Sequence, residues 1–147
     1  MELERILFLT QALATHAVVG YALVRGFTGI DPRIGAIMGV VPDLDFCFPP
    51  EWSWPFVHRG ITHTPLFALT VVLGVYAARQ DRAVERAVGL AIGSHLVIDS
   101  LSPKGIDWLF PLRTAVSPEL PVHGPVATVL LWAVSVGILL EDVRSIR

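Results

Sequence analysis

The sequence is poor in charge and in several residue types on which common protein classes depend. Asp, Glu, Lys and Arg make up only 16% of its 147 residues, against about 25% in an average soluble protein. Cys47 is the only cysteine, which excludes an intrachain disulfide and a zinc site built from several thiolates. Lysine occurs once, the net charge is −2 and no long basic run is present. We therefore expect no nucleic-acid partner bound through its phosphates.

Long apolar segments take the place of charge. Hydrophobic residues make up 53% of the chain and the mean hydropathy is +0.62. A bilayer-spanning helix needs about 20 consecutive apolar residues. Four segments approach that length, and a fifth is too short to cross a bilayer and indicates a half-helix. In chain order the five segments are 6–24, 34–41 (the short one), 65–78, 87–101 and 124–140.

These segments predict an all-α fold, an integral membrane bundle of about four main helices plus one short or half helix. We expect residues 1–147 to form a single membrane-embedded domain in contact with the lipid bilayer. Long connections at 43–64 and 102–124 are rich in proline and tryptophan, and loops of this length are more often functional than incidental. The alternative is a soluble helical bundle with an unusually apolar core, because three segments are shorter than about 20 residues.

The distribution of basic residues predicts an orientation. If the helices alternate in direction, one face of the membrane receives seven basic residues and the other, which carries both long connections, receives four. Basic loops are usually cytoplasmic, so we expect a multi-pass protein of the cell (inner) membrane whose long connections lie on the extracytoplasmic side. The seven are Arg25, Arg33, Arg79, Arg82, Arg86, Arg144 and Arg147, and the four are Arg5, Arg59, Lys104 and Arg113.

One apolar segment contains two polar residues that need an explanation. In "GSHLVIDSLSPKG", His95 and Asp99 are four positions apart, so they lie on one face of a helix, one turn apart. An unpaired carboxylate among apolar groups costs several kcal/mol. A proton, a His–Asp pair or a bound cation could offset that cost.

Most of the other histidines and nearby aspartates fall in three further places. Asp43 and Asp45 follow a proline in "VVPDLDF", His58 and His63 frame "HRGITH", and His16 lies in the first apolar segment. Neutral imidazoles and carboxylates are the ligands that zinc, manganese or iron prefer. The pattern therefore predicts a divalent metal site, zinc first, with either one ion and supporting partners or two adjacent ions. His16 reaches this site most simply if residues 2–13 form a separate interfacial helix.

The same motifs resemble a known family. "THAVVG" at 15–20, "GVVPDLD" at 39–45, "HRGITHT" at 58–64 and "GSHLVIDSLSPKG" at 93–105 are similar to blocks in the LexA-regulated, membrane-bound metal-dependent hydrolases, which are small inner-membrane proteins. This resemblance implies a membrane location and metal-dependent hydrolysis. The spacing of His95 and Asp99 is also similar to one in zinc-dependent phospholipases C and P1-type nucleases, which favours phosphoester cleavage. The substrate is unknown, with a phosphoester or a lipid as the candidates.

The resulting hypothesis gives each residue a role. The metal ligands are His16, Asp43, His63, His95 and Asp99. Asp45 or His58 takes a proton from the attacking water or orients it, and Arg59 binds a phosphate or carboxylate of the substrate. Lys104 is a second candidate for an anionic group, although both cations could instead anchor at lipid headgroups.

A second class of function uses the same residues. Histidines and aspartates inside a membrane also build proton relays, so the alternative is a non-catalytic ion- or proton-coupled carrier. A carrier needs its polar groups near the midplane and open to both sides, whereas a hydrolase at the membrane surface gathers them at one end beside the long loops.

Overall fold

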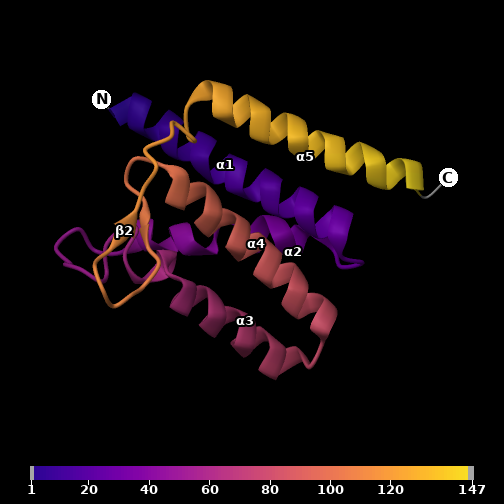
Figure 1. Ribbon diagram of the computed structural model, residues 1–147, viewed down its shortest axis with the longest axis horizontal. Helices are drawn as coiled ribbons and strands as arrows, with labels where there is room; N and C mark the ends of the chain where they lie inside the picture. Colours follow the sequence, from indigo (N-terminus) through magenta and orange to yellow (C-terminus); the bar gives the residue numbers. More distant parts are fainter. Residues whose placement is uncertain (1, 146–147) are drawn as a thin grey trace.

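The computed structural model describes residues 2–145, and these form an almost entirely helical protein (Figure 1). Two short 3-10 helices and one two-stranded antiparallel sheet accompany the α-helices in this part of the chain. The α-helices are α1 (Glu2–Phe27), α2 (Pro32–Met38), α3 (Pro65–Arg79), α4 (Arg82–Leu101) and α5 (Pro125–Ser145). The remaining elements are η1 (Val41–Cys47), η2 (Ile61–His63), β1 (Ile106–Asp107) and β2 (Ala115–Val116).

The prediction of four main helices and one short helix is confirmed, with α2 as the short one. Side-chain oxygens of Asp31, Thr64 and Asp81 accept hydrogen bonds from backbone N–H groups in the first turns of α2, α3 and α4. Pro32 and Pro65 stand in those first turns, where the missing N–H costs nothing. These caps fix where each helix begins.

α1 is one continuous helix, so the expected separate interfacial helix over 2–13 is not present. The structure differs from the sequence prediction at two other places. α4 begins at Arg82, five residues before the apolar segment, because Asp81 caps the charged stretch. The segment 102–124 contains the small β1–β2 hairpin, in which Ile106 pairs with Val116.

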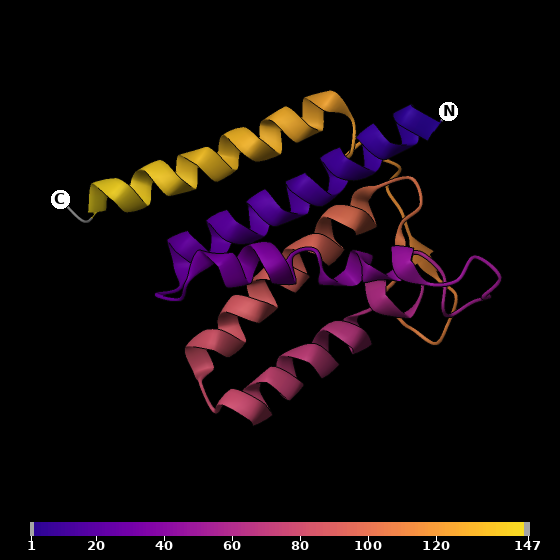
Figure 2. The ribbon, with the colours of Figure 1, turned by 180° about the vertical axis from the view of Figure 1, so that it is seen from behind.

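The helices lie roughly along one direction, and successive helices run in opposite senses (Figures 1 and 2). α5 lies along α1, and α4 lies between α1 and α3. Both long connections gather at one end of the molecule, on the left in Figure 1, and this end is called the loop end below. The α1–α2 link, the α3–α4 turn and the end of α5 lie at the opposite end. Arg147, one of the seven basic residues assigned to that side, lies outside the described residues.

Glycines allow α1 and α2 to pack backbone against backbone. A Cβ atom on Gly20 would lie 2.3 Å from the carbonyl oxygen of Gly35, and one on Gly39 would lie 2.5 Å from the carbonyl oxygen of His16. Such distances are too short for any side chain, and small residues are what permits this approach between helices. The contact holds Gly39, which lies two residues before η1, against His16 in the middle of α1.

Two helices are long and apolar enough to cross a membrane, Leu3–Phe27 and Pro125–Asp142, each with a mean hydropathy of 1.6. Only 22% and 6% of their apolar windows are buried within the protein. Large apolar side chains such as Val126, Val129 and Leu130 on α5 are more than 60% exposed. A continuous exposed apolar surface of this kind is typical of contact with lipid rather than water.

Candidate metal centre

All five histidines of the chain meet three aspartates at the loop end of the helices. The histidines come from α1, from the two long connections and from α4, and they form three overlapping groups of metal-ligating side chains with the aspartates. Three of the histidines and all three aspartates are at most 6% exposed. Because buried carboxylates need partners, this concentration of polar groups calls for a common explanation.

The first group contains Asp43, His63, His95 and Asp99, whose ligand atoms all lie within 4.8 Å of one another. Nε2 of His63 lies 3.1 Å from Nε2 of His95, 3.4 Å from Oδ1 of Asp43 and 3.4 Å from Oδ2 of Asp99. Nε2 of His95 lies 3.6 Å from the same Asp99 oxygen and 3.9 Å from the Asp43 oxygen. Ligand atoms at about 2.0–2.1 Å from a tetrahedral zinc ion are about 3.3–3.4 Å apart. The donor spacings therefore fit one divalent ion.

The hydrogen bonds on the far side of each ring select the tautomer that a metal needs. Nδ1 of His95 donates to the carbonyl oxygen of Gly39 at 2.7 Å, and Nδ1 of His63 donates to Oδ2 of Asp45 at 3.0 Å. Each neutral ring then has its lone pair on Nε2. Such a carboxylate or carbonyl partner behind the ring is characteristic of metal-bound histidines. Two lone pairs 3.1 Å apart repel each other, so a cation or a proton must lie between them.

The carboxylate of Asp45 accepts hydrogen bonds from four groups. The donors are Thr62 Oγ1 at 2.7 Å, the backbone N–H of Arg59 at 3.1 Å and His58 Nδ1 at 3.0 Å, besides His63. Burial opposes ionisation of this carboxyl, but the hydrogen bonds from His58, His63 and Thr62 outweigh it and hold its pKa well below the usual value. Asp45 is therefore an ionised anchor for two histidines.

The same carboxylates act on His63. Burial lowers the pKa of its imidazole, but hydrogen bonds to Asp43, Asp45 and Asp99 outweigh burial and raise that pKa to about 10. In the absence of a cation, His63 thus holds the proton that lies between the two Nε2 atoms.

The second oxygen of Asp99 faces the second group of ligands. Oδ1 lies 2.9 Å from Nε2 of His123 and 3.3 Å from Nε2 of His16. Nδ1 of both rings is buried without a hydrogen-bond partner among the described residues. The rings of His16 and His95 stack at 3.8 Å. Asp99 therefore lies between the two groups, with one oxygen in each.

Arg59 closes the site on the side of the long loops. Its Nη2 lies 3.1 Å from Oδ2 of Asp99, and its Nη1 donates to Ser102 Oγ and to the backbone oxygen of Asp99. Arg59 has a φ of 64°, an unusual conformation for a residue other than glycine. Its backbone N–H bond to Asp45 fixes the main chain there, and the side chain is directed inward to Asp99.

A small cavity of about 30 Å³ lies against these residues. It is lined by ligands from both groups and by His58 and Arg59, together with Phe8 of α1. A cavity needs about 10–15 Å³ of such space to hold a water molecule, so there is room for water beside these side chains.

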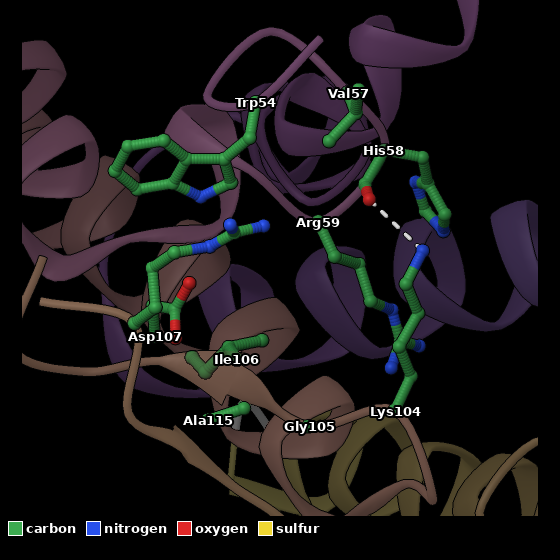
Figure 3. A pocket seen from close by; sticks show the side chains of 10 residues that line it. Trp54, Val57, His58, Arg59, Lys104, Gly105, Ile106, Asp107 and Ala115 are labelled. Atoms are coloured by element: carbon green, nitrogen blue, oxygen red, sulfur yellow. Dashed lines mark hydrogen bonds between the residues drawn. The ribbon is translucent and has the colours of Figure 1, made fainter. Parts of the chain in front are cut away.

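A larger pocket of about 390 Å³ opens next to the cavity and shares His58 and Arg59 with it. Figure 3 shows Arg59 and Lys104 side by side in this pocket, with Trp54 across from them. The Lys104 ammonium donates to the backbone oxygen of His58 at 2.9 Å. Arg113 also lines the pocket, and its guanidinium lies 4.9 Å from the centre of the Trp54 ring. Arg59 is paired with Asp99, but Lys104 and Arg113 still outnumber Asp107, so this space is called the electropositive pocket below.

The structure brings every sequence-predicted site residue into this one region. Asp43, His63, His95 and Asp99 form the group with metal-like spacing, whereas His16 lies on the other oxygen of Asp99, outside that group. Asp45, His58 and Arg59 border it. Sequence reasoning left out His123, which lies near the end of the second long connection and belongs to no paired motif. The signal that could have identified His123 is its position in the connection that follows α4, because this connection folds back onto the end of that helix.

The geometry can be compared with known proteins at this point. The model of the YdjM inner membrane protein family matches residues 8–145. The chain belongs to this family. The inner membrane protein YbcI of Escherichia coli is 33% identical over 113 residues, which cover 66% of this chain and 65% of YbcI. The uncharacterized protein YvsG of Bacillus subtilis is 27% identical over 126 residues, which cover 74% of this chain and 78% of YvsG.

The chain thus spans slightly less than two thirds of YbcI. No solved structure matches it significantly. Membership of an inner membrane protein family, together with two helices long enough to cross a bilayer, identifies a membrane protein.

Proposed function

We propose that this member of the YdjM family is a metal-dependent hydrolase of the inner membrane that acts on phosphoesters. The observation that carries the proposal is the spacing of four ligand atoms from Asp43, His63, His95 and Asp99. Their separations of 3.1–3.9 Å lie around the edge length of a tetrahedral metal site. Zinc is the first choice for two imidazoles and two carboxylates, with manganese or iron as alternatives. A divalent ion at this place would polarise a phosphoryl oxygen and lower the pKa of a bound water.

The residues around the ligands have distinct tasks. Asp45 is saturated with hydrogen bonds and orients His58 and His63. His58 is the better proton acceptor, because Asp45 holds its Nδ1, its side chain is 29% exposed, and it lines both the small cavity and the electropositive pocket. Arg59 holds Asp99 and brings a positive charge to the cavity, where it would stabilise charge on a phosphoryl group.

His16 and His123 fit either of two arrangements. They hold the second oxygen of Asp99 in place, or they ligate a second ion that Asp99 bridges to the first. The number of ions bound per chain distinguishes the two.

The location of the site supports a hydrolase over a carrier. Three of the five histidines come from the long connections. His95 and Asp99 lie in the last two turns of α4, next to the second of these connections. The basic helix ends lie at the opposite end, which supports a site on the extracytoplasmic side of a multi-pass protein.

Elemental analysis of the detergent-purified protein tests the metal. Wild type should contain one or two equivalents of zinc, manganese or iron, and His63→Ala and Asp99→Asn should each lose most of it. Asp31→Asn is the matched control, because an asparagine also caps a helix and Asp31 lies outside the site. A metal-free wild type after purification without chelators, and after incubation with each of the three ions, would contradict the proposal.

Hydrolysis is tested with p-nitrophenyl phosphate and bis-p-nitrophenyl phosphate. We expect wild type to cleave at least one of them, a chelator to stop the reaction, and the ion found by elemental analysis to restore it. Equal rates in wild type and Asp99→Asn would show that the activity comes from a contaminant and would count against a catalytic role.

A further inference from the structure

Two pockets adjoin the small cavity, one lined by cationic side chains and the other mainly by apolar ones. On one side lies the electropositive pocket described above, which shares His58 and Arg59 with the cavity. On the other lies a pocket of about 640 Å³ that shares Phe8 and His123 with it. We call this second pocket the apolar groove. Its wall consists of Glu4, Leu7, Phe8 and Gln11 from α1 and of Pro103, Pro121, Val122, His123, Gly124 and Pro125 from the second long connection and the start of α5.

The apolar groove is continuous with the surface that faces lipid. Leu7 and Phe8 are 60% and 51% exposed, and they belong to the helix Leu3–Phe27 that is long enough to cross the membrane. Gln11 connects the α1 wall of the groove to the other wall. Its Nε2 donates to the backbone oxygen of His123 at 3.0 Å and to Thr128 Oγ1 at 2.7 Å. A hydrocarbon chain could therefore pass from the bilayer into the groove without crossing water.

Phe8 stands between the groove and the metal ligands. Its ring meets the ring of His123 edge to face, with 6.1 Å between the centroids, and it lines both the groove and the cavity. The inner end of the groove is thus an aromatic edge next to His123, which contacts Asp99.

The electropositive pocket has the opposite chemistry. Arg59, Lys104 and Arg113 line it with Asp107 as the only carboxylate among its lining residues. Burial and the neighbouring charge of Arg59 lower the pKa of Lys104, which means that an anion placed there would gain from both cations and relieve their repulsion.

We propose that the substrate is an anionic lipid phosphoester that spans all three spaces. Its hydrocarbon chain lies in the apolar groove, its scissile phosphoryl group in the cavity at Asp99, and an anionic headgroup, such as a second phosphate, in the electropositive pocket. This substrate class rests on the proposed hydrolase function, but the binding it requires can be measured without turnover.

Three probes separate the parts of this ligand. Farnesyl diphosphate has both the chain and the anionic head, inorganic diphosphate lacks the chain, and phosphatidylcholine has chains with a headgroup of no net charge. Binding is measured in detergent micelles from the emission of Trp54, which lines the electropositive pocket, with Trp54→Phe identifying its share of the signal. Farnesyl diphosphate should bind at least about tenfold more tightly than either partial probe.

Variants assign each part to its pocket. Lys104→Gln with Arg113→Gln should weaken farnesyl diphosphate and inorganic diphosphate alike by about tenfold. Val122→Trp, which fills the groove, should weaken only farnesyl diphosphate. Leu7→Trp narrows the groove from the other wall and replaces Val122→Trp if that variant fails to fold. The controls are Arg82→Gln, at the opposite end of the bundle, and Val129→Trp, an exposed residue of α5 outside the groove.

The outcomes distinguish this inference from the hydrolase proposal. In one outcome, metal-loaded protein binds farnesyl diphosphate in a way that needs both its hydrocarbon chain and its charge, yet releases no phosphate. That result would support the lipid ligand and contradict the hydrolase. Cleavage of p-nitrophenyl phosphate together with equal affinity for farnesyl diphosphate and inorganic diphosphate would overturn the lipid ligand alone. Affinities within about twofold of wild type in the Lys104→Gln, Arg113→Gln double variant would overturn the headgroup assignment.

Discussion

At the scale of single residues, the site depends on which nitrogen of each histidine is already engaged. His63 and His95 have hydrogen-bond acceptors at Nδ1 and are directed at each other through Nε2. His58 is held at the same nitrogen by Asp45 but is partly exposed. This difference is the basis for the roles proposed above, ligation for the buried pair and proton transfer for His58.

We predict that His58→Gln separates these tasks. The amide cannot accept a proton from water at neutral pH, so phosphoester hydrolysis should fall about 10²–10⁴-fold, the usual contribution of a general base. Metal content should stay at the wild-type level, because His58 is outside the group of four ligands. Elemental analysis and a rate assay on the same sample check both statements, and partial rescue by added imidazole would support the role. Loss of metal in this variant would instead make His58 a ligand.

Metal uptake should release a proton. His63 has its pKa raised to about 10 by Asp43, Asp45 and Asp99, although burial opposes this, so near pH 7 the metal-free ring is protonated on both nitrogens. A cation can bind Nε2 only after that proton leaves, and acid therefore favours the proton over the metal. Below the pKa of His63, affinity for zinc should rise about tenfold for each pH unit if one proton is displaced.

Calorimetric titration of metal-stripped protein in buffers of different ionisation enthalpy measures this proton directly. His63→Ala should release fewer protons along with its loss of affinity. A wild-type affinity that does not change between pH 6 and pH 8 would show that the Nε2 atoms share no proton.

At the scale of helices and loops, the apolar segments were enough to predict the α-helices but not their ends or the shorter elements. The four long helices and the short one lie where apolar runs indicated them. The start of α4 at Arg82 was missed because a capped, charged turn has no apolar period, and the two-residue strands of the hairpin are too short to produce one. The α1–α2 contact was also missed, since a glycine shows in the sequence only that a close approach is allowed.

The residues of the candidate site show the same division. Asp43, Asp45, His58, His63, His95 and Asp99 were identified because polar residues in apolar or proline-bounded segments are costly unless paired. His123 was missed because nothing local distinguishes it, and only the return of the second long connection brings it 2.9 Å from Asp99. His16 was placed in the metal group, but its distance to Asp99 puts it on the other oxygen.

The glycine contact between α1 and α2 should control the metal site from a distance. His95 donates to the carbonyl oxygen of Gly39, and a Cβ atom at Gly39 would overlap the backbone of His16. Gly39→Val should force the helices apart, which costs about 1–3 kcal/mol by overpacking, and should displace both His95 and Asp43 from His63. We expect a lower midpoint of thermal unfolding and a loss of bound metal.

Gly137→Val is the matched control, because a side chain at Gly137 meets no atom within 4 Å. Metal content and thermal midpoint should stay near wild type in that variant. Full metal occupancy in Gly39→Val would mean that the site does not depend on the α1–α2 contact.

At the scale of the whole molecule, the protein has two chemically different ends and an apolar flank. The loop end carries the histidines, the aspartates and the electropositive pocket, and the opposite end carries arginines at the helix termini. α5 is almost entirely exposed along an apolar surface. Basic helix ends usually stay in the cytoplasm during insertion, which is the basis for the proposed extracytoplasmic site.

The single cysteine makes this orientation measurable. Cys47 ends η1 at the loop end and is exposed, so a membrane-impermeant maleimide should label it in intact spheroplasts if the site is extracytoplasmic. Ala78→Cys in a Cys47→Ser background places an exposed thiol in the last turn of α3, at the opposite end. That thiol should react only after the membrane is permeabilised. The reverse labelling pattern would put the site on the cytoplasmic side, where a lipid phosphoester would have to come from the inner leaflet. Labelling of both thiols in intact spheroplasts would contradict a membrane boundary between the two ends.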